Sequence, residues 1–515
     1  MTVAQWFIFF LLVQVVHFIG TWKLYVSAGR KSWEAAIPVY NAIVLLKIIG
    51  RPSWWTILLF LPIINLILFP VIWIETLRSF GKNSTLDKVL GVATFGLYIA
   101  YISYTQKLHY TSDRSTETVN KTADTISSLL FAIVVATFVH TYFIQPFTIP
   151  TSSLEKTLLV GDFLFVSKVN YGARTPMTTV ALPMVHDTIP LTKKKSYLTW
   201  PELPYFRLPG FQKVERNDIV VFNWPIDTVY KFRDQSGLRV DKPIDKKSNY
   251  VKRCVGVPGD QFEIKDGIVF VNGKELILPE RARPQFSYKV ALDGKTPIDF
   301  EYLLQDMDIT DGAGFMDAEK RDTLFIAALT AANAERLQQI PGITGVQKII
   351  SKEVEPGIFP HINKWNRDNF GPIYIPQQGK TVALNLETLP FYKAIITDYE
   401  KNDLKVTGSE IRINGKIATS YTFQQNYYWM MGDNRHNSED SRYWGYVPEN
   451  HIVGKPTFIW MSYDSNAKGL KKIRWERLFT TVSGEGQPQS YFKFFLFALV
   501  AYFIGEYFWK KKKTM

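Results

Sequence analysis

The sequence contains very little cysteine, since Cys254 is the single cysteine among 515 residues. This excludes an intrachain disulfide framework and a zinc site built from cysteines. The seven histidines show no metal-ligand spacing, and no phosphate-binding loop or nucleotide fingerprint is present, so we expect no metal and no cofactor. Charged residues make up only 21% of the chain and aromatic residues 15%, a balance that excludes a disordered protein.

Positive charge, in contrast, is in excess, with a formal net charge of +13. Such an excess is found in proteins that bind nucleic acid and also in membrane proteins whose apolar segments are flanked by Lys and Arg. The basic run 193–195 is a candidate for nucleic-acid contact. The aromatic spacing of an RNA-binding surface is absent, so we expect no nucleic-acid partner and assign the charge to anionic lipid headgroups.

Apolar residues are concentrated in five segments, and about 20 such residues are needed to span a bilayer. The segments are 4–22, 53–74, 89–104, 126–144 and 494–509. Prolines interrupt the second segment, and the third is short and weakly apolar. No positively charged region precedes the first segment and no small-residue cleavage site follows it, so we do not expect a removed signal peptide.

The distribution of Lys and Arg predicts how these segments are oriented. Loops 23–52 and 105–125 and the terminal run 510–513 carry lysines and arginines, which are enriched on the cytoplasmic side of membrane proteins. Five spans with an outside N-terminus satisfy all three assignments. The sequence therefore predicts a multi-pass protein of the cell (inner, cytoplasmic) membrane, with segment 145–490 on the extracytoplasmic face.

Segment 145–490 is predicted to be mainly β. Runs at 218–222, 250–257, 262–273 and 410–416 alternate or cluster β-branched residues, and the Asp-Gly and Asn-Gly pairs within the last two are hairpin-turn signals. The exception is 317–338, which opens with acidic residues and is predicted to be a helix.

Three short stretches of this outer segment contain the candidate reaction centre: FTIPTSSLEKTLLVGDFLFVSK (147–168), YVKRCVGVPGD (250–260) and MGDNRHNSEDSRYWGYVP (431–448). Serine is a poor nucleophile at neutral pH and needs an adjacent base. A lysine can be that base only when neutral, so its pKa must fall from about 10.4 toward the operating pH, which desolvation achieves.

Alternation along a strand over 250–257 places Lys252 on one face with Tyr250 and Cys254, and Arg253 on the other. Lys252 is therefore expected among an aromatic ring and an apolar sulfur. Cys254 beside Arg253 is either a reactive thiol, because a neighbouring cation lowers thiol pKa, or a buried strand residue, and we expect the buried residue.

Taken in order, the three stretches resemble the boxes of bacterial type I signal peptidase, a membrane-bound Ser/Lys dyad serine protease also known as leader peptidase. The first box aligns on Pro150 and on Thr157-Leu158, which puts the nucleophile at Ser153 rather than Ser152. The Lys-Arg box matches Lys252 and Arg253. The last box is nearly a full match, and its matching residues are Gly432, Asp433, Asn434, Arg435, Ser438, Asp440, Ser441, Arg442, Trp444 and Gly445. The first box departs from the family pattern where Ser152, Leu154 and Lys156 replace Gly, Met and Pro.

The resemblance implies roles for the matched residues. Ser153 attacks the substrate carbonyl while Lys252 takes its proton, the Ser-Lys variant of triad logic. The position of Ser438 orients the lysine, and the Thr151 hydroxyl joins the Ser153 backbone N–H in an oxyanion hole. Further support of the site is expected from an Asp440–Arg442 ion pair and from Tyr250, with Asp433 and Arg435 in turn-forming roles.

Other acidic residues are not expected to form a second site. Loop 433–440 superficially resembles a calcium loop, but Ser438 stands where glycine is required and the terminal Glu is missing. The remaining acids are expected to be loop and helix-start residues: Asp308, Asp311, Asp317 and Glu319.

The expected fold is a mainly β catalytic domain of signal-peptidase type with a small α/β insert, plus multi-pass α-helical transmembrane segments. The predicted domains are an N-terminal membrane domain (1–121), an anchor (122–145), the catalytic core (146–265 and 428–480), an insert or cap (266–427) and a C-terminal transmembrane segment (491–509). The N-terminal domain is similar to a small membrane domain attached to such peptidases.

The resemblance predicts cleavage of N-terminal signal peptides from exported preproteins. The expected partners are signal peptides with small residues before the cleavage site, membrane lipid and the protein export machinery. The altered residues around Ser153 also motivate an alternative, a catalytically inactive relative that acts as a membrane assembly or substrate-binding partner. A self-cleaving Ser-Lys protease of the repressor type is a third hypothesis, disfavoured by the membrane spans.

Overall fold

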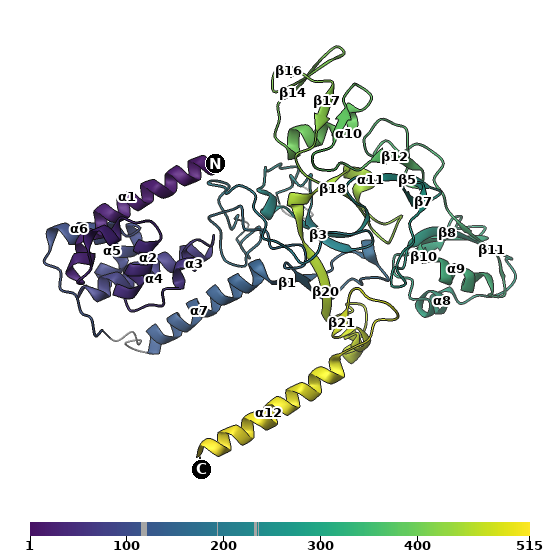
Figure 1. Ribbon diagram of the computed structural model, residues 1–515. Coiled ribbons are helices and arrows are strands. Elements are labelled where there is room, and N and C mark those ends of the chain that lie inside the picture. The colour runs from purple at the N-terminus through teal and green to yellow at the C-terminus, as the bar shows by residue number, and fades with distance from the viewer. Residues whose placement is uncertain (115–120, 193, 231–233, 235, 515) are drawn as a thin grey trace. The chain divides into compact units, whose positions relative to one another are not determined.

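The computed structural model describes residues 1–114, 121–192, 194–230, 234 and 236–514. Lys193, of the basic run 193–195, and the side chains of Lys512 and Lys513, of the terminal basic run, lie outside the description. The chain forms two compact units (Figure 1). The first contains Met1–Phe143, Ala173–Leu208 and Thr228–Lys247, and the second contains Ile144–Gly172, Pro209–Asp227 and Ser248–Met515. The functional domain boundaries given above stay predictions.

The first unit is helical over its N-terminal part. Two long helices, α1 (Val3–Ser27) and α7 (Lys121–Tyr142), enclose five shorter ones in the chain: α2 (Tyr40–Ile48), α3 (Trp55–Leu59), α4 (Ile64–Ser79), α5 (Thr85–Ala93) and α6 (Leu97–Thr105). A core that includes Leu24, Val44, Ile72 and Leu77 joins α1, α2 and α4. Apolar burial of this kind is what stabilises short helices, which are marginal in isolation.

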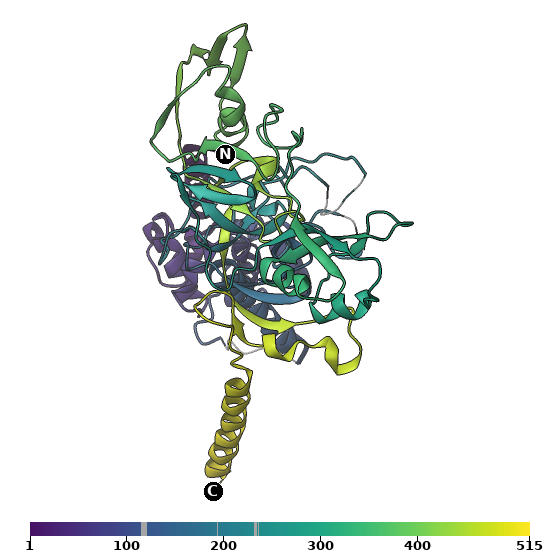
Figure 2. The ribbon, with the colours of Figure 1, turned by 90° about the vertical axis from the view of Figure 1, so that its right-hand side faces the viewer.

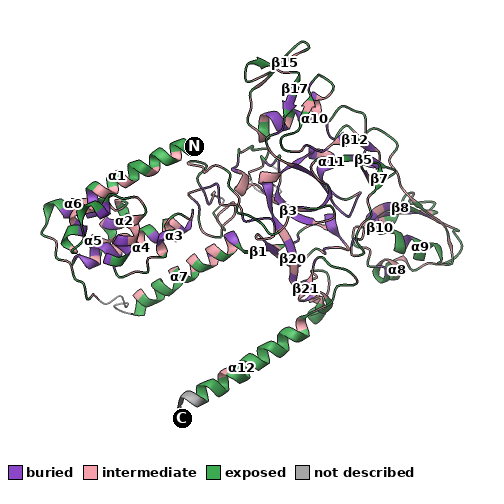
Figure 3. Ribbon diagram, in the orientation of Figure 1, coloured by how far each residue is buried: buried purple, intermediate pink, exposed green. Residues whose placement is uncertain are grey.

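Three helices in the described residues are long and apolar enough to cross a membrane: α1, α7 and α12 (Phe492–Thr514). Most of their side chains are exposed (Figure 3), as expected of helices whose solvent is lipid. They correspond to the predicted spans 4–22, 126–144 and 494–509.

The predictions of single spans at 53–74 and 89–104 are wrong. The first is broken between α3 and α4, where Pro62 is followed by Ile63 at φ 70°. The second is broken between α5 and α6, where Phe95 and Gly96 have φ of 52° and 84°. A left-handed residue ends an α-helix, so neither segment forms a helix of spanning length.

The second unit is built on an eight-stranded antiparallel sheet (Figures 1 and 2). Its order is β1-β2-β20-β3-β4-β18-β19, and β21 pairs with β20. The strands are β1 (Ile144–Thr148), β2 (Asp162–Ser167), β3 (Ile219–Asn223), β4 (Asn249–Gly256), β18 (Tyr427–Met431), β19 (Val447–Pro448), β20 (Ile452–Ser462) and β21 (Thr480–Thr481). This order brings β4 beside β18, although about 170 residues separate them in the chain.

The residues between β4 and β18 form smaller sheets. One has the order β12-β5-β6-β7, and its strands are β5 (Gln261–Lys265), β6 (Ile268–Val271), β7 (Lys274–Glu275) and β12 (Phe370–Tyr374). A second, β11-β8-β10-β9, contains β8 (Gln285–Leu292), β9 (Ala313–Phe315), β10 (Thr323–Thr330) and β11 (Ile343–Lys348), with helices α8 (Phe300–Asp306) and α9 (Ala331–Gln338). The prediction of a small α/β insert is therefore confirmed.

The remaining elements before the last catalytic segment are short. They are β13 (Thr381–Ala383) paired with β17 (Ser420–Thr422), the hairpins of β14 (Leu404–Thr407), β15 (Glu410–Ile413) and β16 (Lys416–Ile417), and helix α10 (Leu389–Ala394). Helix α11 (Ser441–Trp444) follows β18.

The four predicted β runs are confirmed, including both hairpin turns, where Asp266-Gly267 and Asn414-Gly415 have positive φ. The predicted helix over 317–338 is wrong in its first half. Residues 323–330 are strand β10, whose side chains alternate between buried and half-buried positions against β8. The helix begins only at Ala331, where the Thr330 hydroxyl caps the Asn333 N–H.

Candidate active site

Ser153 and Lys252 lie together beside β4, an interior strand of the central sheet. Ser153 is in a 3-10 turn, Ser152–Leu154, that follows β1, and Lys252 is in the middle of β4. The Lys252 Nζ atom is 2.5 Å from the Ser153 Oγ atom. Both residues are buried, with exposed fractions of 7% for Ser153 and 3% for Lys252. The two residues singled out from the sequence are thus within hydrogen-bond reach, the geometry that a nucleophile and its base require.

Burial is the main influence on the charge of Lys252. It lowers the lysine pKa from 10.5 to about 8, against the nearby carboxylates of Asp440 and Glu439, which raise it. An ammonium removed from water loses hydration that neighbouring protein groups replace only in part. At that pKa roughly one tenth of the lysine is neutral at pH 7, far more than at its ordinary pKa, and a general base must be neutral.

The face of β4 that carries Lys252 is aromatic and apolar, as alternation predicted. Lys252 Nζ lies 5.6 Å from the centroid of the Tyr250 ring. That ring packs against Trp224 and Trp444, with centroids 5.2 and 5.4 Å away. Cys254 is fully buried on the same face, and burial raises the pKa of its thiol. A reactive thiolate at Cys254 is therefore not supported.

The loop after β18 carries the predicted ion pair. Asp440 accepts two hydrogen bonds from Arg442, from Nε at 2.9 Å and from NH2 at 2.8 Å. The same carboxylate accepts from the Gly432 N–H and from the Ser438 hydroxyl, at 3.1 and 2.8 Å. Asp440 thus holds the two ends of loop 432–442 together, because one carboxylate can accept hydrogen bonds from several donors at once.

Ser438 is buried in this loop. Among the described residues its hydroxyl donates to Asp440, and no hydrogen bond joins it to Lys252. A hydroxyl that donates to a carboxylate still has lone pairs with which to accept from an ammonium. The lysine-orienting role of Ser438 stays a prediction.

Thr151 is half-buried and immediately precedes the turn that holds Ser153. Its backbone is extended, with φ −138° and ψ 154°, and its side chain makes no capping hydrogen bond to the turn. The Thr151 hydroxyl therefore does not cap the turn. Its place in an oxyanion hole is untested and stays a prediction.

Asp433, expected only to form a turn, instead makes a buried ion pair. Its carboxylate accepts from Arg253 Nε at 2.8 Å and NH2 at 2.6 Å, and from the Thr157 hydroxyl at 2.6 Å. Arg253 lies on the face of β4 opposite Lys252, so this pair fixes β4 to the loop after β18 and to the nucleophile segment. Alternation along the strand predicted that Arg253 lies on the face opposite Lys252. It could not predict that the partner of Arg253 is Asp433, 180 positions away. Arg435 lies in the turn that Asn434 and Asn437 close.

Two acids of the insert reach the nucleophile segment. Asp308 makes an ion pair with Lys156, at 2.5 Å. Asp311 accepts from the side-chain amides of Asn434 and Asn437, and Asn437 also donates to the Ser152 hydroxyl. Lys156, which departs from the family pattern, thus has a partner in the insert. These contacts could not be predicted from the sequence, because they join three segments that are distant in the chain.

A buried serine within hydrogen-bond reach of a lysine is the arrangement that serine-type hydrolases of the Ser-Lys kind use. The model of the family described as signal peptidase, peptidase S26, matches residues 122–323 and 374–461, more than half of the chain. The chain therefore belongs to the signal peptidase family, peptidase S26, and the resemblance seen in the sequence is confirmed. Residues 33–113 match a family of unknown function, DUF5684.

Individual relatives agree with this membership. Signal peptidase I of Buchnera aphidicola subsp. Acyrthosiphon pisum (strain APS) is 26% identical over 345 residues, which cover 65% of this chain and 74% of the relative. Signal peptidase I of Haemophilus influenzae (strain ATCC 51907 / DSM 11121 / KW20 / Rd) is 24% identical over 379 residues, which cover 71% and 77% of the two chains.

Proposed function

We propose that this chain is a membrane-bound signal peptidase that cleaves signal peptides from exported preproteins with Ser153 as nucleophile and Lys252 as general base. The observation that supports it most directly is the 2.5 Å contact between Ser153 Oγ and Lys252 Nζ, with the lysine buried. Membership of the signal peptidase family and the name of the relatives, signal peptidase I, support the substrate.

The reaction begins when neutral Lys252 takes the proton of the Ser153 hydroxyl as Oγ forms a bond to the substrate carbonyl carbon. The carbonyl oxygen becomes an oxyanion, which the Ser153 backbone N–H and the Thr151 hydroxyl would stabilise. Loss of one such donor typically costs about 3 kcal/mol of transition-state stabilisation. Protonated Lys252 then gives its proton to the departing amine as the C–N bond breaks, which leaves an ester on Ser153.

Water completes the cycle. Lys252 takes a proton from the attacking water, the ester C–O bond breaks, and Ser153 recovers its proton as the free signal peptide leaves. In this scheme Ser438 and Tyr250 orient the lysine, and the Asp440–Arg442 pair, buried and bidentate, holds the Ser438 loop.

The long apolar helices α1, α7 and α12 support attachment to the cell membrane. The Lys and Arg content of loops 23–52 and 105–125 supports an extracytoplasmic catalytic domain. In this placement the apolar part of the signal peptide lies in the bilayer, and small side chains before the cleavage site enter shallow pockets. Membrane lipid and the export machinery are the partners that this placement requires.

Processing of a preprotein by the purified full chain in detergent micelles tests the proposal. We expect wild type to release the signal peptide, and Ser153→Ala and Lys252→Met to lose at least about 1000-fold in rate, as loss of a nucleophile or base does. Ser152→Ala and Lys265→Met are matched controls, because Ser152 is the neighbouring serine and Lys265 is an exposed lysine on β5. Activity that survives both dyad substitutions contradicts the dyad, and an inactive wild type favours the non-enzymatic membrane partner.

A further inference from the structure

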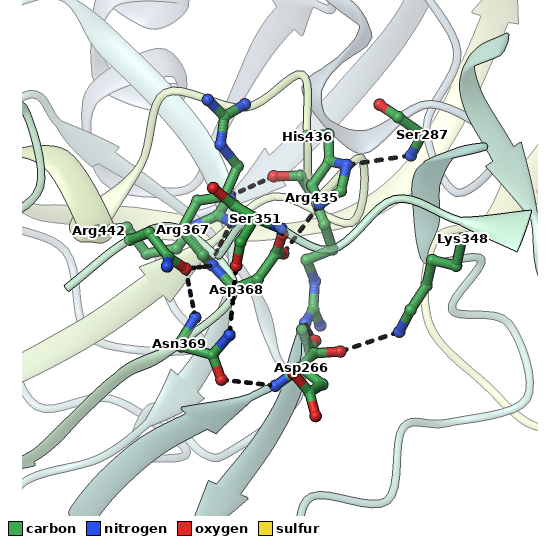
Figure 4. Close-up of polar contacts among 12 residues, drawn as sticks. Asp266, Ser287, Lys348, Ser351, Arg367, Asp368, Asn369, Arg435, His436 and Arg442 are labelled. Atoms are coloured by element: carbon green, nitrogen blue, oxygen red, sulfur yellow. Dashed lines mark hydrogen bonds and ion pairs between the residues drawn. The ribbon is translucent and has the colours of Figure 1, made fainter. Parts of the chain in front are cut away.

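His436 lies in the loop that carries Ser438 and Asp440, and its ring is held from both sides (Figure 4). The Ser287 backbone N–H donates to His436 Nδ1 at 3.1 Å. On the other side, His436 Nε2 is 2.9 Å from Asp368 Oδ1. The exposed fractions of the two side chains are 6% and 1%. Both hydrogen bonds are therefore shielded from water, where they are harder to replace.

The two contacts fix the tautomer of the ring. Because Nδ1 accepts a hydrogen bond, the proton of the neutral imidazole is on Nε2, which donates to the Asp368 carboxylate. The other Asp368 oxygen accepts from the Ser351 N–H at 2.8 Å. Burial on its own raises the pKa of Asp368, but the hydrogen bonds from His436 and the Ser351 N–H, with the charge of Arg442, outweigh it and hold the pKa below its usual value. The carboxylate is thus ionised, and losing its partner is costly.

Both partners of His436 come from the insert. Ser287 is in β8, and Asp368 precedes β12 in residues 324–373, which lie outside the two segments that the family model matches. The backbone is joined at the same place: Gln285 N–H donates to the Asp433 carbonyl, and the Arg435 N–H donates to the Gln285 carbonyl, both at 2.9 Å. The insert is therefore bonded directly to the loop.

A short path leads from these contacts to the proposed catalytic lysine. Arg442 NH2 donates to the Arg435 carbonyl at 2.6 Å, and Arg442 is the ion-pair partner of Asp440. Asp440 in turn accepts from Ser438. Displacement of His436 would therefore move the Asp440 carboxylate, whose charge raises the pKa of Lys252, together with the Ser438 hydroxyl that donates to it.

We propose that His436 is a positioning residue through which the insert, by way of Asp368 and Ser287, holds the Ser438–Asp440 loop in register with Lys252. This inference rests on the proposed dyad of Ser153 and Lys252. It gives residues 324–373 a role in the peptidase reaction: they complete the support of the catalytic loop and need not contact the substrate.

The test compares three variants of the full chain in the preprotein assay. His436→Phe removes both ring hydrogen bonds, His436→Gln keeps a donor for Asp368, and Asp368→Asn removes the carboxylate. We expect His436→Phe and Asp368→Asn each to lower kcat by about 10- to 100-fold with KM within about twofold, the effect of a small misplacement of catalytic groups. His436→Gln should recover most of the loss, and the pH midpoint of kcat should move in His436→Phe.

Additivity and a control complete the design. The double variant should lose no more than the worse single variant, because both act through one contact. His109→Phe, an exposed histidine of the first unit, should behave as wild type. If His436→Phe folds and keeps the wild-type kcat and pH midpoint, or if the two losses multiply, the inference is overturned. Should His436→Phe fail to fold, Asp368→Asn decides by the same criteria: a wild-type kcat in that variant overturns the inference. Wild-type rates in Ser153→Ala would instead overturn the dyad.

Discussion

Lys252 is a lysine whose environment pulls its pKa in two directions. Burial lowers the pKa, while Asp440 and Glu439 raise it. Asp440 is committed to Arg442 and to its own loop, whereas Glu439 is exposed and its carboxylate makes no ion pair in the described residues. Glu439 is therefore the residue through which the pKa of the base can be changed with least structural damage.

The pH profile follows from this balance. With a lysine pKa of about 8, the neutral fraction and kcat/KM should rise about tenfold per pH unit below pH 8 and level off above it. Glu439→Gln removes a charge that favours the ammonium, so the pKa falls, the rising limb moves to lower pH, and the rate at pH 7 increases. The profile is measured on a preprotein in micelles at constant ionic strength. Glu387→Gln, an exposed acid elsewhere, should leave it unchanged, and a shift toward higher pH would contradict the assignment.

At the scale of elements, the site depends on how closely the nucleophile turn and the Ser438 loop approach each other. Gly432, the first residue of that loop after β18, lies where the two meet. A Cβ atom added there would be 2.2 Å from Ser438 Oγ and 2.5 Å from the Ser153 carbonyl oxygen. One of these is a backbone atom, so the contact cannot be relieved by a side-chain rotation alone.

Gly432→Ala should therefore separate the Ser438 loop from the Ser153 turn. We expect kcat to fall by at least about tenfold, since small displacements of reacting groups are costly, with the chain still folded by thermal melting. The control is Gly357→Ala, where an added Cβ meets no atom within 4 Å. A wild-type kcat in Gly432→Ala would show that this close approach is not needed.

Elements set by local pattern could be predicted from the sequence, and pairings across the chain could not. The strand around Lys252 and the turns at Asp266-Gly267 and Asn414-Gly415 are signalled by neighbouring residues. Residues 323–330 mislead because their apolar run suits a helix or a strand equally, and the pairing with β8 decides for the strand. The Arg253–Asp433 pair could not be predicted for the same reason: it depends on β4 lying beside β18.

For the whole molecule, the three helices long and apolar enough to cross a membrane predict a division of the chain between lipid and water. The single cysteine makes this division easy to test, because Cys254 is fully buried, and burial raises its thiol pKa. The thiol of the native chain should therefore not react with thiol reagents.

A membrane-impermeant maleimide applied to intact cells should label Ser409→Cys, in the exposed turn between β14 and β15, and should not label Ser27→Cys, at the end of α1, until the membrane is permeabilised. Labelling of more than about half of Ser409→Cys in intact cells agrees with the positive-inside prediction. The opposite pattern would invert the topology and place the catalytic domain in the cytoplasm.

The covalent link from α7 to the nucleophile turn limits how far Ser153 can lie from the end of α7. α7 ends at Tyr142, and Ser153 follows about 11 residues later. A fully extended chain of that length spans at most roughly 40 Å. If α7 lies in the bilayer, as proposed, Ser153 cannot stand farther above the membrane than that length of chain allows. A preprotein would then have to present its cleavage site within the same height, so the distance of a peptide bond from the lipid would contribute to the choice of cleavage site.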